Sequence, residues 1–322
     1  MKPHLIIRLA PRAASATATA PAWSDAVRDK SDVGGRLHPD VDRVLDRHRV
    51  GVWVTAEYRP RDPSGRWTAQ ELESGLNRVY RLILQDNREI PPGLVEDISL
   101  LPVVEQVRPG LIARSELPRA SALSGDDRTG RAAIGLDEAS DYTRGDKRVL
   151  VAVLDTGIDL AHPELADSLR PGRDFVDILD GAGKRFGAWL LDNINSAVKW
   201  AVDQGADVIN MSLGVRHEGG GLPHREVVDY ARRNGVTIVA ASGNDGRREL
   251  YYPGALPHVI AVGAADNRGR VSSARSSWPT STWPRSRPRT PRRSWSARPT
   301  RIPTQRSCST MSAAPRSPAR SC

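Results

Sequence analysis

Cysteine is nearly absent from this sequence: among 322 residues only Cys308 and Cys322 are cysteines, and both lie close to the C-terminal end. The rest of the chain therefore has no disulfide framework and no cysteine-based metal site. No stretch is long and apolar enough to cross a membrane. The apolar patch Leu5-Ile6-Ile7 is interrupted by Arg8 and is too short for the core of a secretory signal peptide. The compartment, secreted or cytoplasmic, stays open.

Lysine and acidic residues are missing from residues 276–322, which have ten arginines and many Ser and Pro. Because the whole chain has a net charge of +9, residues 1–275 carry about −1 and give no reason to expect nucleic-acid binding. No periodic apolar face can be drawn after Val271, so we interpret residues 276–322 as a disordered basic tail. A second hypothesis is that this tail is translated out of frame, since a GC-rich gene read in the wrong register gains Arg, Pro and Ser. The coding DNA would test it.

The N-terminal third predicts one small folded unit. Residues 1–47 are polar, and we expect a loose segment. Residues 48–110 predict a compact α+β unit: a strand through Val50–Ala56 by alternation, an amphipathic helix, and an extended stretch over 94–107. Thr68 and Glu71 have the spacing of a capping box, with Trp67 placed to contact Leu72. The helix is predicted from apolar residues at helical spacing, namely Leu72, Leu76, Val79, Tyr80 and Ile83. Residues 111–133 read as a linker, followed by a short helix near 134–139.

Strands and helices alternate from Arg148 onward. The continuous apolar run over 149–154 predicts a strand buried on both faces. A helix over 194–202 ends at Gly205, and a second over 227–231 ends at Gly235. Further strands are expected at 208–211, 236–241 and 259–262. This alternation predicts an α/β fold with a parallel sheet and right-handed crossovers.

Three of these strands end in polar and small residues: 155–159 (Asp-Thr-Gly-Ile-Asp), 210–214 (Asn-Met-Ser-Leu-Gly) and 241–246 (Ala-Ser-Gly-Asn-Asp-Gly). Functional groups of open α/β sheets lie at such carboxyl ends. Each motif alone has an ordinary alternative. Asp155 could cap a turn, the second motif could be a plain strand end, and the third could be an Asn-Asp-Gly turn.

Taken together, and in this order, the three motifs resemble those of the subtilisin family of serine proteases (subtilases, peptidase S8), over residues 134–271. The resemblance implies a parallel-sheet subtilisin-like core and proteolysis of a protein or peptide substrate. It implies that Asp155 orients the catalytic imidazole and that Asn244 donates to the oxyanion. Ser212, Leu213 and Gly214 would present their backbone to an extended peptide.

The resemblance also concerns the N-terminal unit and metals. Residues 48–110 lie where this family often has a propeptide, which assists folding and blocks the cleft until it is removed. An unrelated small α+β domain is the alternative. Members of the family often bind calcium, although no cofactor site is evident in the sequence.

Two motifs of the family are missing. Its histidine lies in Gly-His-Gly-Thr-His, and its nucleophile in Gly-Thr-Ser-Met-Ala, and neither occurs here. Asp174–Asp177 runs directly into Ile178, which indicates an internal deletion and leaves 134–275 as a partial peptidase domain. None of the seven histidines has the expected Gly/Thr surroundings, and Ser312 lacks the motif's glycine. Two triad members would thus be absent, and such losses can lower turnover about a millionfold.

Three hypotheses follow for function. The first is a truncated or frameshifted subtilisin-like serine endopeptidase that is inactive as written. The second is a non-catalytic peptide-binding protein. The third is a protein that binds polyanions through its basic tail, which steep salt dependence would reveal.

Overall fold

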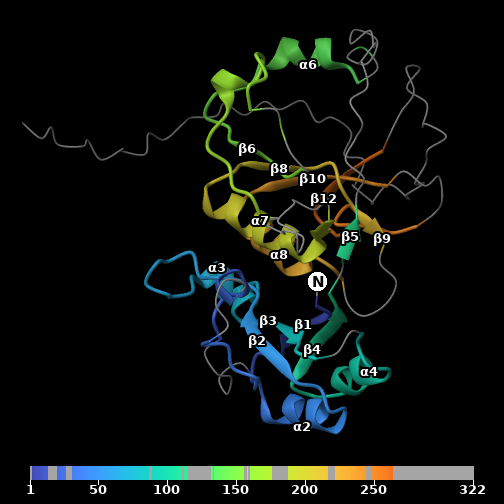
Figure 1. The fold of residues 1–322 in the computed structure, drawn as a ribbon. Coiled ribbons are helices and arrows are strands. Elements are labelled where there is room, and N and C mark those ends of the chain that lie inside the picture. Colours follow the sequence, from blue (N-terminus) through green and yellow to red (C-terminus); the bar gives the residue numbers. More distant parts are fainter. Residues whose placement is uncertain are drawn as a thin grey trace, which may run out of the picture. The chain divides into compact units, whose positions relative to one another are not determined.

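The computed structural model describes residues 2–13, 20–26, 31–86, 89–110, 112–114, 132, 134–155, 158, 160–175, 188–216, 222–243 and 249–263. The tail, both cysteines, Ser312 and Asn244 lie outside these ranges. We call residues 2–110 the N-terminal lobe and residues 134–263 the C-terminal lobe (Figure 1); both belong to one compact unit, residues 1–281. Within the described ranges, no helix has the length and apolar character needed to cross a membrane.

The N-terminal lobe is built on a four-stranded antiparallel sheet with the order β2-β3-β1-β4. Its strands are β1 (His4–Leu9), β2 (Val52–Ala56), β3 (Val79–Leu84) and β4 (Val104–Pro109). Helices α2 (Pro39–Arg47) and α4 (Leu94–Ser99) pack against one face through a buried cluster that includes Leu5, Ile7 and Leu82. Helices α1 (Trp23–Ala26) and α3 (Ala69–Glu73) and the 3-10 turn η2 (Leu76–Arg78) complete the lobe.

The first strand corrects the expectation of a loose segment over residues 1–47. Residues 4–9 form β1, which pairs with β3 on one side and with β4 on the other. Leu5, Ile7 and Leu9 alternate along it and are fully buried, so their burial outweighs the break that Arg8 makes in the apolar run. Residues 39–47, also assigned to the loose segment, form α2.

The predicted helix over 72–83 is also wrong beyond Glu73. The capping box of Thr68 and Glu71 is present, but helix α3 ends at Glu73 and Gly75 turns the chain at φ 72°. The following residues form β3, because Tyr80, Leu82 and Leu84 alternate into the core. Leu72 is largely exposed. In the predicted extended stretch, residues 94–99 instead form α4.

The C-terminal lobe contains the predicted parallel sheet. Its strands are β6 (Val151–Val153), β8 (Val208–Met211), β10 (Thr237–Ala241) and β12 (Val259–Val262), in the order β12-β10-β8-β6. All three neighbouring pairs are parallel. Helices α7 (Leu191–Asp203) and α8 (Arg225–Arg233) pack on this sheet through one core cluster, and Gly205 and Gly235 follow them with positive φ as predicted.

Strand β6 differs from the prediction of burial on both faces. Leu150, Ala152 and Leu154 pack against the core, whereas Val151 and Val153 are 51% and 55% exposed. The register aligns Val151 with Val208, and Ile260 and Val262 of β12 are similarly exposed. This face of the sheet is therefore uncovered by the part of the chain that the structure describes, and β6 forms one end of the strand order.

Short elements complete the fold. Strand β5 (Ile112–Arg114), which falls in the predicted linker, pairs antiparallel with β7 (Ala188–Leu190). Strand β9 (Val215–Arg216) pairs antiparallel with β11 (Tyr251–Tyr252), directly after the predicted substrate segment. Helix α6 (Leu136–Tyr142) and the 3-10 turn η3 (Ala166–Ser168) precede and follow β6.

Candidate functional site

Because the strands are parallel, the predicted catalytic segments follow the carboxyl ends of neighbouring strands at the same side of the sheet. Strands β6 and β10 both pair with β8, so residues that follow these strands leave the sheet at the same edge. The backbone N–H of Leu154 donates to the carbonyl of Asn210 at 2.9 Å, which holds the start of the Asp155 loop beside β8. Asp155 and Ser212 are exposed, and Leu213 and Gly214 are half-buried. Among the described residues, Asp155 and Ser212 therefore lie exposed at the carboxyl ends of neighbouring strands.

The loop after β10 is shaped by a glycine. Gly243 has φ 98°, a conformation that side chains disfavour, and a Cβ on it would collide with the ring of Tyr251. Ser242 is buried, and its N–H donates to the carbonyl of Val262 at 2.9 Å. The next residue, Asn244, lies outside the described residues, so its predicted oxyanion role stays a prediction.

Two described histidines of the C-terminal lobe, His162 and His224, have local contacts. Nδ1 of His162 accepts from the N–H of Glu164 at 3.2 Å. His224 is buried at the N-terminal end of α8, with its Nδ1 2.5 Å from Oδ1 of Asn195. His217 is outside the described residues. In the N-terminal lobe, His48 lies 2.7 Å from the Asp97 carboxylate.

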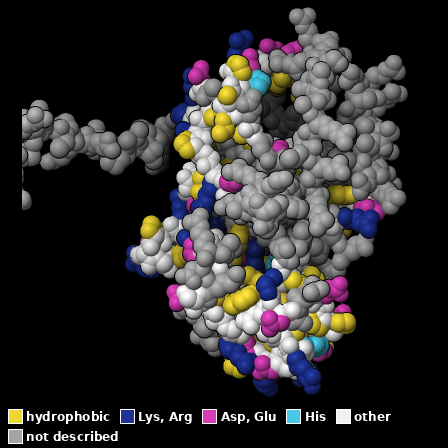
Figure 2. Space-filling view, in the orientation of Figure 1, with side chains coloured by type: hydrophobic (Ala, Val, Ile, Leu, Met, Phe, Trp, Pro, Cys, Tyr) yellow, Lys and Arg dark blue, Asp and Glu magenta, His cyan; other side chains and the backbone are white. Residues whose placement is uncertain are grey.

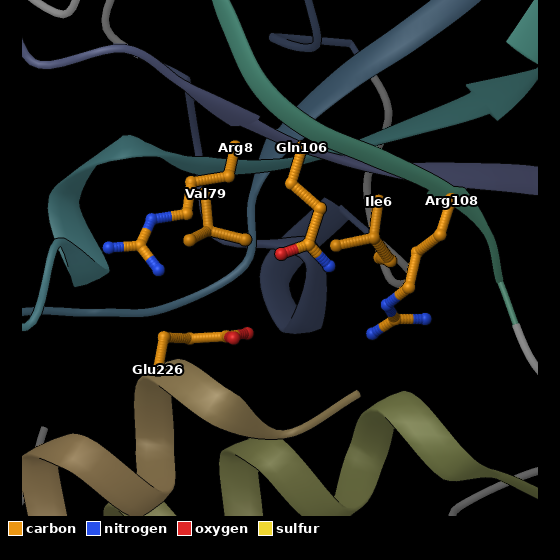
Figure 3. A pocket seen from close by; sticks show the side chains of 6 residues that line it. All are labelled: Ile6, Arg8, Val79, Gln106, Arg108 and Glu226. Carbon is orange, nitrogen blue, oxygen red and sulfur yellow. The ribbon is translucent and has the colours of Figure 1, made fainter. Parts of the chain in front are cut away.

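A second group of polar residues lies where the N-terminal lobe meets α7 and α8. Ile6 and Val79 of the N-terminal sheet belong to the same buried cluster as Val198 of α7 and Val227 of α8. Figure 3 shows Arg8, Gln106 and Arg108 projecting from the sheet toward α8, where Glu226 faces them across a small pocket. The sheet thus has one apolar face, against α2 and α4, and one largely polar face, against α7 and α8.

Tyr58 and Glu226 form a buried hydrogen bond between the two lobes. The Tyr58 hydroxyl donates to Oε1 of Glu226 at 2.8 Å, and both residues are buried. Burial raises the pKa of Tyr58 well above its usual value, and the nearby charges of Glu226 and Glu57 raise it further, while Arg108 acts in the opposite direction. The hydroxyl therefore stays a donor at neutral pH.

Glu71 and Lys199 form a buried ion pair across the same contact. Nζ of Lys199 lies 2.7 Å from Oε1 of Glu71 and 2.8 Å from Oδ2 of Asp203, one turn further along α7. The Tyr230 hydroxyl of α8 donates to the other oxygen of Asp203 at 2.8 Å. Lys199 also lies 5.3 Å from the centre of the Tyr230 ring.

The Glu71 carboxylate is satisfied from three segments. Its Oε1 accepts from the N–H of Arg61 at 2.8 Å, and its Oε2 accepts from the N–H and hydroxyl of Thr68 at 2.8 and 2.9 Å. Burial by itself would raise the pKa of Glu71, but the hydrogen bonds from Lys199, Thr68 and Arg61 lower it below its usual value. Glu71 is thus ionised at neutral pH although no part of it is exposed.

Sequence reasoning missed these interlobe residues. Glu71 was identified only as a helix cap, and Tyr58, Lys199 and Glu226 were not singled out. One signal was present: Lys199 and Asp203 lie four residues apart on a helix with an apolar face, a spacing that favours an ion pair. No local sequence pattern identifies Glu71, on the other lobe, as a partner of Lys199.

The described residues offer no evident metal site. The described ranges contain no group of three or more His, Cys, Asp or Glu side chains arranged to hold a metal ion. Calcium stays an expectation from the family resemblance. Figure 2 shows acidic and basic side chains interspersed over the visible face of the N-terminal lobe, in keeping with the nearly neutral body of the chain.

Known proteins resemble part of this chain. Residues 187–288 match the family model described as the subtilase family, Peptidase_S8. The match begins after Asp155 and runs past residue 276, where the tail was predicted to begin. The thermophilic serine proteinase of Bacillus sp. (strain AK1) is 32% identical over 175 residues, which cover 42% of this chain and 43% of that protein. Subtilisin of Bacillus pumilus is 31% identical, over 39% of this chain and 61% of its own length.

A solved structure, that of the prenylagaramide maturation protease PagA, is 26% identical with a TM-score of 0.36, and covers 44% of this chain and 63% of that one. The chain thus spans less than two thirds of the length of these relatives. The segment matched by the family model contains α7, β8, α8, β10 and β12, but not β6 or Asp155. On these matches, part of the chain is similar to members of the subtilase family.

Proposed function

We propose that this chain carries the peptide-binding edge of a subtilisin-like serine endopeptidase, and that as written it binds an extended peptide without hydrolysing it. One observation carries the proposal: Asp155 and the Ser212–Gly214 segment leave neighbouring strands at one exposed edge of the sheet. The family's activity is peptide bond hydrolysis by an Asp/His/Ser triad. The sequence has no His or Ser motif to accompany Asp155.

In this proposal, Asp155 is the triad carboxylate and Asn244 the oxyanion donor. The backbone of Ser212, Leu213 and Gly214 pairs with the peptide as an added strand would, so main-chain hydrogen bonds supply affinity. Without an imidazole to take a proton from a nucleophile, the carboxylate has no catalytic step to support.

The N-terminal lobe acts, in the same proposal, as an intramolecular propeptide-like unit. Its polar sheet face covers the outer surface of α7 and α8, and Tyr58, Glu71 and Ile6 contact these helices. The apolar face of the sheet packs on the lobe's own helices, and its polar face packs on the other lobe. The N-terminal lobe can therefore separate from the C-terminal lobe without exposing its own apolar core.

Two assays on the full chain test the peptide-binding edge. A chromogenic peptide reports hydrolysis, and the fluorescence anisotropy of a labelled extended peptide reports binding. We expect binding without turnover. Leu213→Pro, which removes a backbone N–H, should weaken binding about tenfold, the equivalent of one hydrogen bond. Ser212→Ala, which changes only a side chain, should leave binding unchanged.

Each assay can contradict the proposal. Hydrolysis that a serine-directed inhibitor abolishes would show that a complete triad exists in this chain. Equal binding by the Leu213→Pro variant and the unmodified chain would show that the peptide does not pair with this backbone.

A further inference from the structure

Among the described residues, the contact between the lobes contains a buried ion pair, Glu71–Lys199. Glu71 is completely buried and Lys199 nearly so. A second ion pair joins α3 to α8, Arg233 to Glu73 at 2.7 Å, but both of its side chains are substantially exposed. The loss of the buried pair should therefore weaken the contact between the lobes more than the loss of the exposed pair. Exposed pairs contribute little, whereas removing one partner of a buried pair leaves an uncompensated charge.

The buried pair is also complete in its hydrogen bonds. Glu71 accepts from Lys199, from Thr68 and from Arg61, so both carboxylate oxygens are used. Lys199 shares its charge with Asp203, so one cation balances two carboxylates. A partner lobe without a carboxylate at position 71 would leave Lys199 and Asp203 as a pair. A helix without a cation at position 199 would bring two carboxylates together in a dry contact.

We propose that the Glu71–Lys199 pair is the specificity determinant by which the α7–α8 surface selects its own N-terminal lobe. The partner that fits this surface is an α+β lobe that presents a buried carboxylate at the first turn of its α3 helix. The inference rests on the proposed role of the N-terminal lobe as a propeptide-like unit, and it names the contact that makes this role selective. The apolar contacts of Ile6 and Val79 favour any partner with an apolar surface. The ion pair, in contrast, also disfavours a partner lobe that has no carboxylate to place beside Lys199.

The test uses the full chain with a site for a sequence-specific protease inserted within residues 115–130, outside the described elements. The folded chain is cut, and the dissociation constant of the two pieces is measured by dilution and size-exclusion chromatography. Lys199→Met should weaken association about 100-fold or more, because Glu71 and Asp203 lose their shared cation. Glu71→Gln, which keeps the acceptor for Thr68 and Arg61, should weaken it about tenfold.

The double variant distinguishes the interaction between Glu71 and Lys199 from the packing of each side chain alone. Glu71→Gln combined with Lys199→Met should associate more tightly than Lys199→Met alone, since the second change removes a buried charge that has lost its partner. Glu73→Gln and Arg233→Met are the matched controls at the exposed pair, and each should change association less than about threefold. Lys199→Arg keeps the cation and should stay closer to the unmodified chain than Lys199→Met does.

The outcomes distinguish the two proposals. If the pieces of the unmodified chain separate at micromolar concentration, the propeptide-like role itself fails. If they stay together but Lys199→Met lies within threefold of the unmodified chain, or the double variant is no tighter than Lys199→Met, the specificity inference fails alone. Circular dichroism of the uncut variants checks folding, and Lys199→Gln replaces Lys199→Met in the cycle if the latter does not fold.

Discussion

Removal of the Tyr58 hydroxyl should destabilise the chain measurably. Tyr58 is buried, and its hydroxyl donates to the buried Glu226 carboxylate at 2.8 Å. A hydrogen bond to a charged group contributes about 1.5–3 kcal/mol, and the carboxylate left behind keeps its desolvation cost. We therefore expect Tyr58→Phe to lower the free energy of unfolding by about 2 kcal/mol.

Urea unfolding followed by tryptophan fluorescence measures this loss. Tyr142→Phe is the control, because Tyr142 is 91% exposed and its change should stay within about 0.5 kcal/mol. Glu226→Gln keeps an acceptor without the charge, so Tyr58→Phe should cost less in that background than in the unmodified chain. If Tyr58→Phe unfolds within 0.5 kcal/mol of the unmodified chain, the reasoning about this buried bond is refuted.

Three further predictions concern pH and backbone conformation. The pKa of Tyr58 and that of Tyr230 are raised by burial and by nearby carboxylates. The two protonated tyrosines therefore contribute fully to the free energy of unfolding below pH 10, and this contribution is lost as the pH rises above 10. Urea unfolding at alkaline pH, followed by fluorescence, should show the loss in the unmodified chain but not in the double Phe variant. The pKa of Glu71 is lowered, so its contribution is present above about pH 4.5 and disappears as pH falls, a trend that Glu71→Gln should flatten in acid titrations. Gly243→Ala should cost about 1–3 kcal/mol in thermal unfolding, more than Gly145→Ala, which has a similar φ but open space for the methyl group.

The C-terminal lobe was largely predictable because its pattern is local. Helices α7 and α8 have apolar residues at helical spacing followed by a glycine, and the strands β8, β10 and β12 that follow them are short apolar runs. Burial of β6 on both faces was wrong, since an apolar run does not tell how many neighbouring elements cover a strand.

The N-terminal lobe was harder to predict for a physical reason. Arg8 interrupts the apolar residues of β1 and projects toward α8, so the sequence of β1 does not look like that of a buried strand. Residues 76–83 fit helical spacing as well as strand alternation, and tertiary contacts decided between them. The Glu71–Lys199 pair joins residues far apart in the sequence, and no local pattern could indicate it.

The uncovered side of the parallel sheet has a consequence for handling the protein. Val151 and Val153 on β6, and Ile260 and Val262 on β12, expose branched side chains along the two outer strands of the sheet. Covering these side chains would be worth on the order of several kcal/mol. A hydrophobic dye that binds them gains that free energy without unfolding the chain, so dye fluorescence in native buffer would not by itself report denaturation.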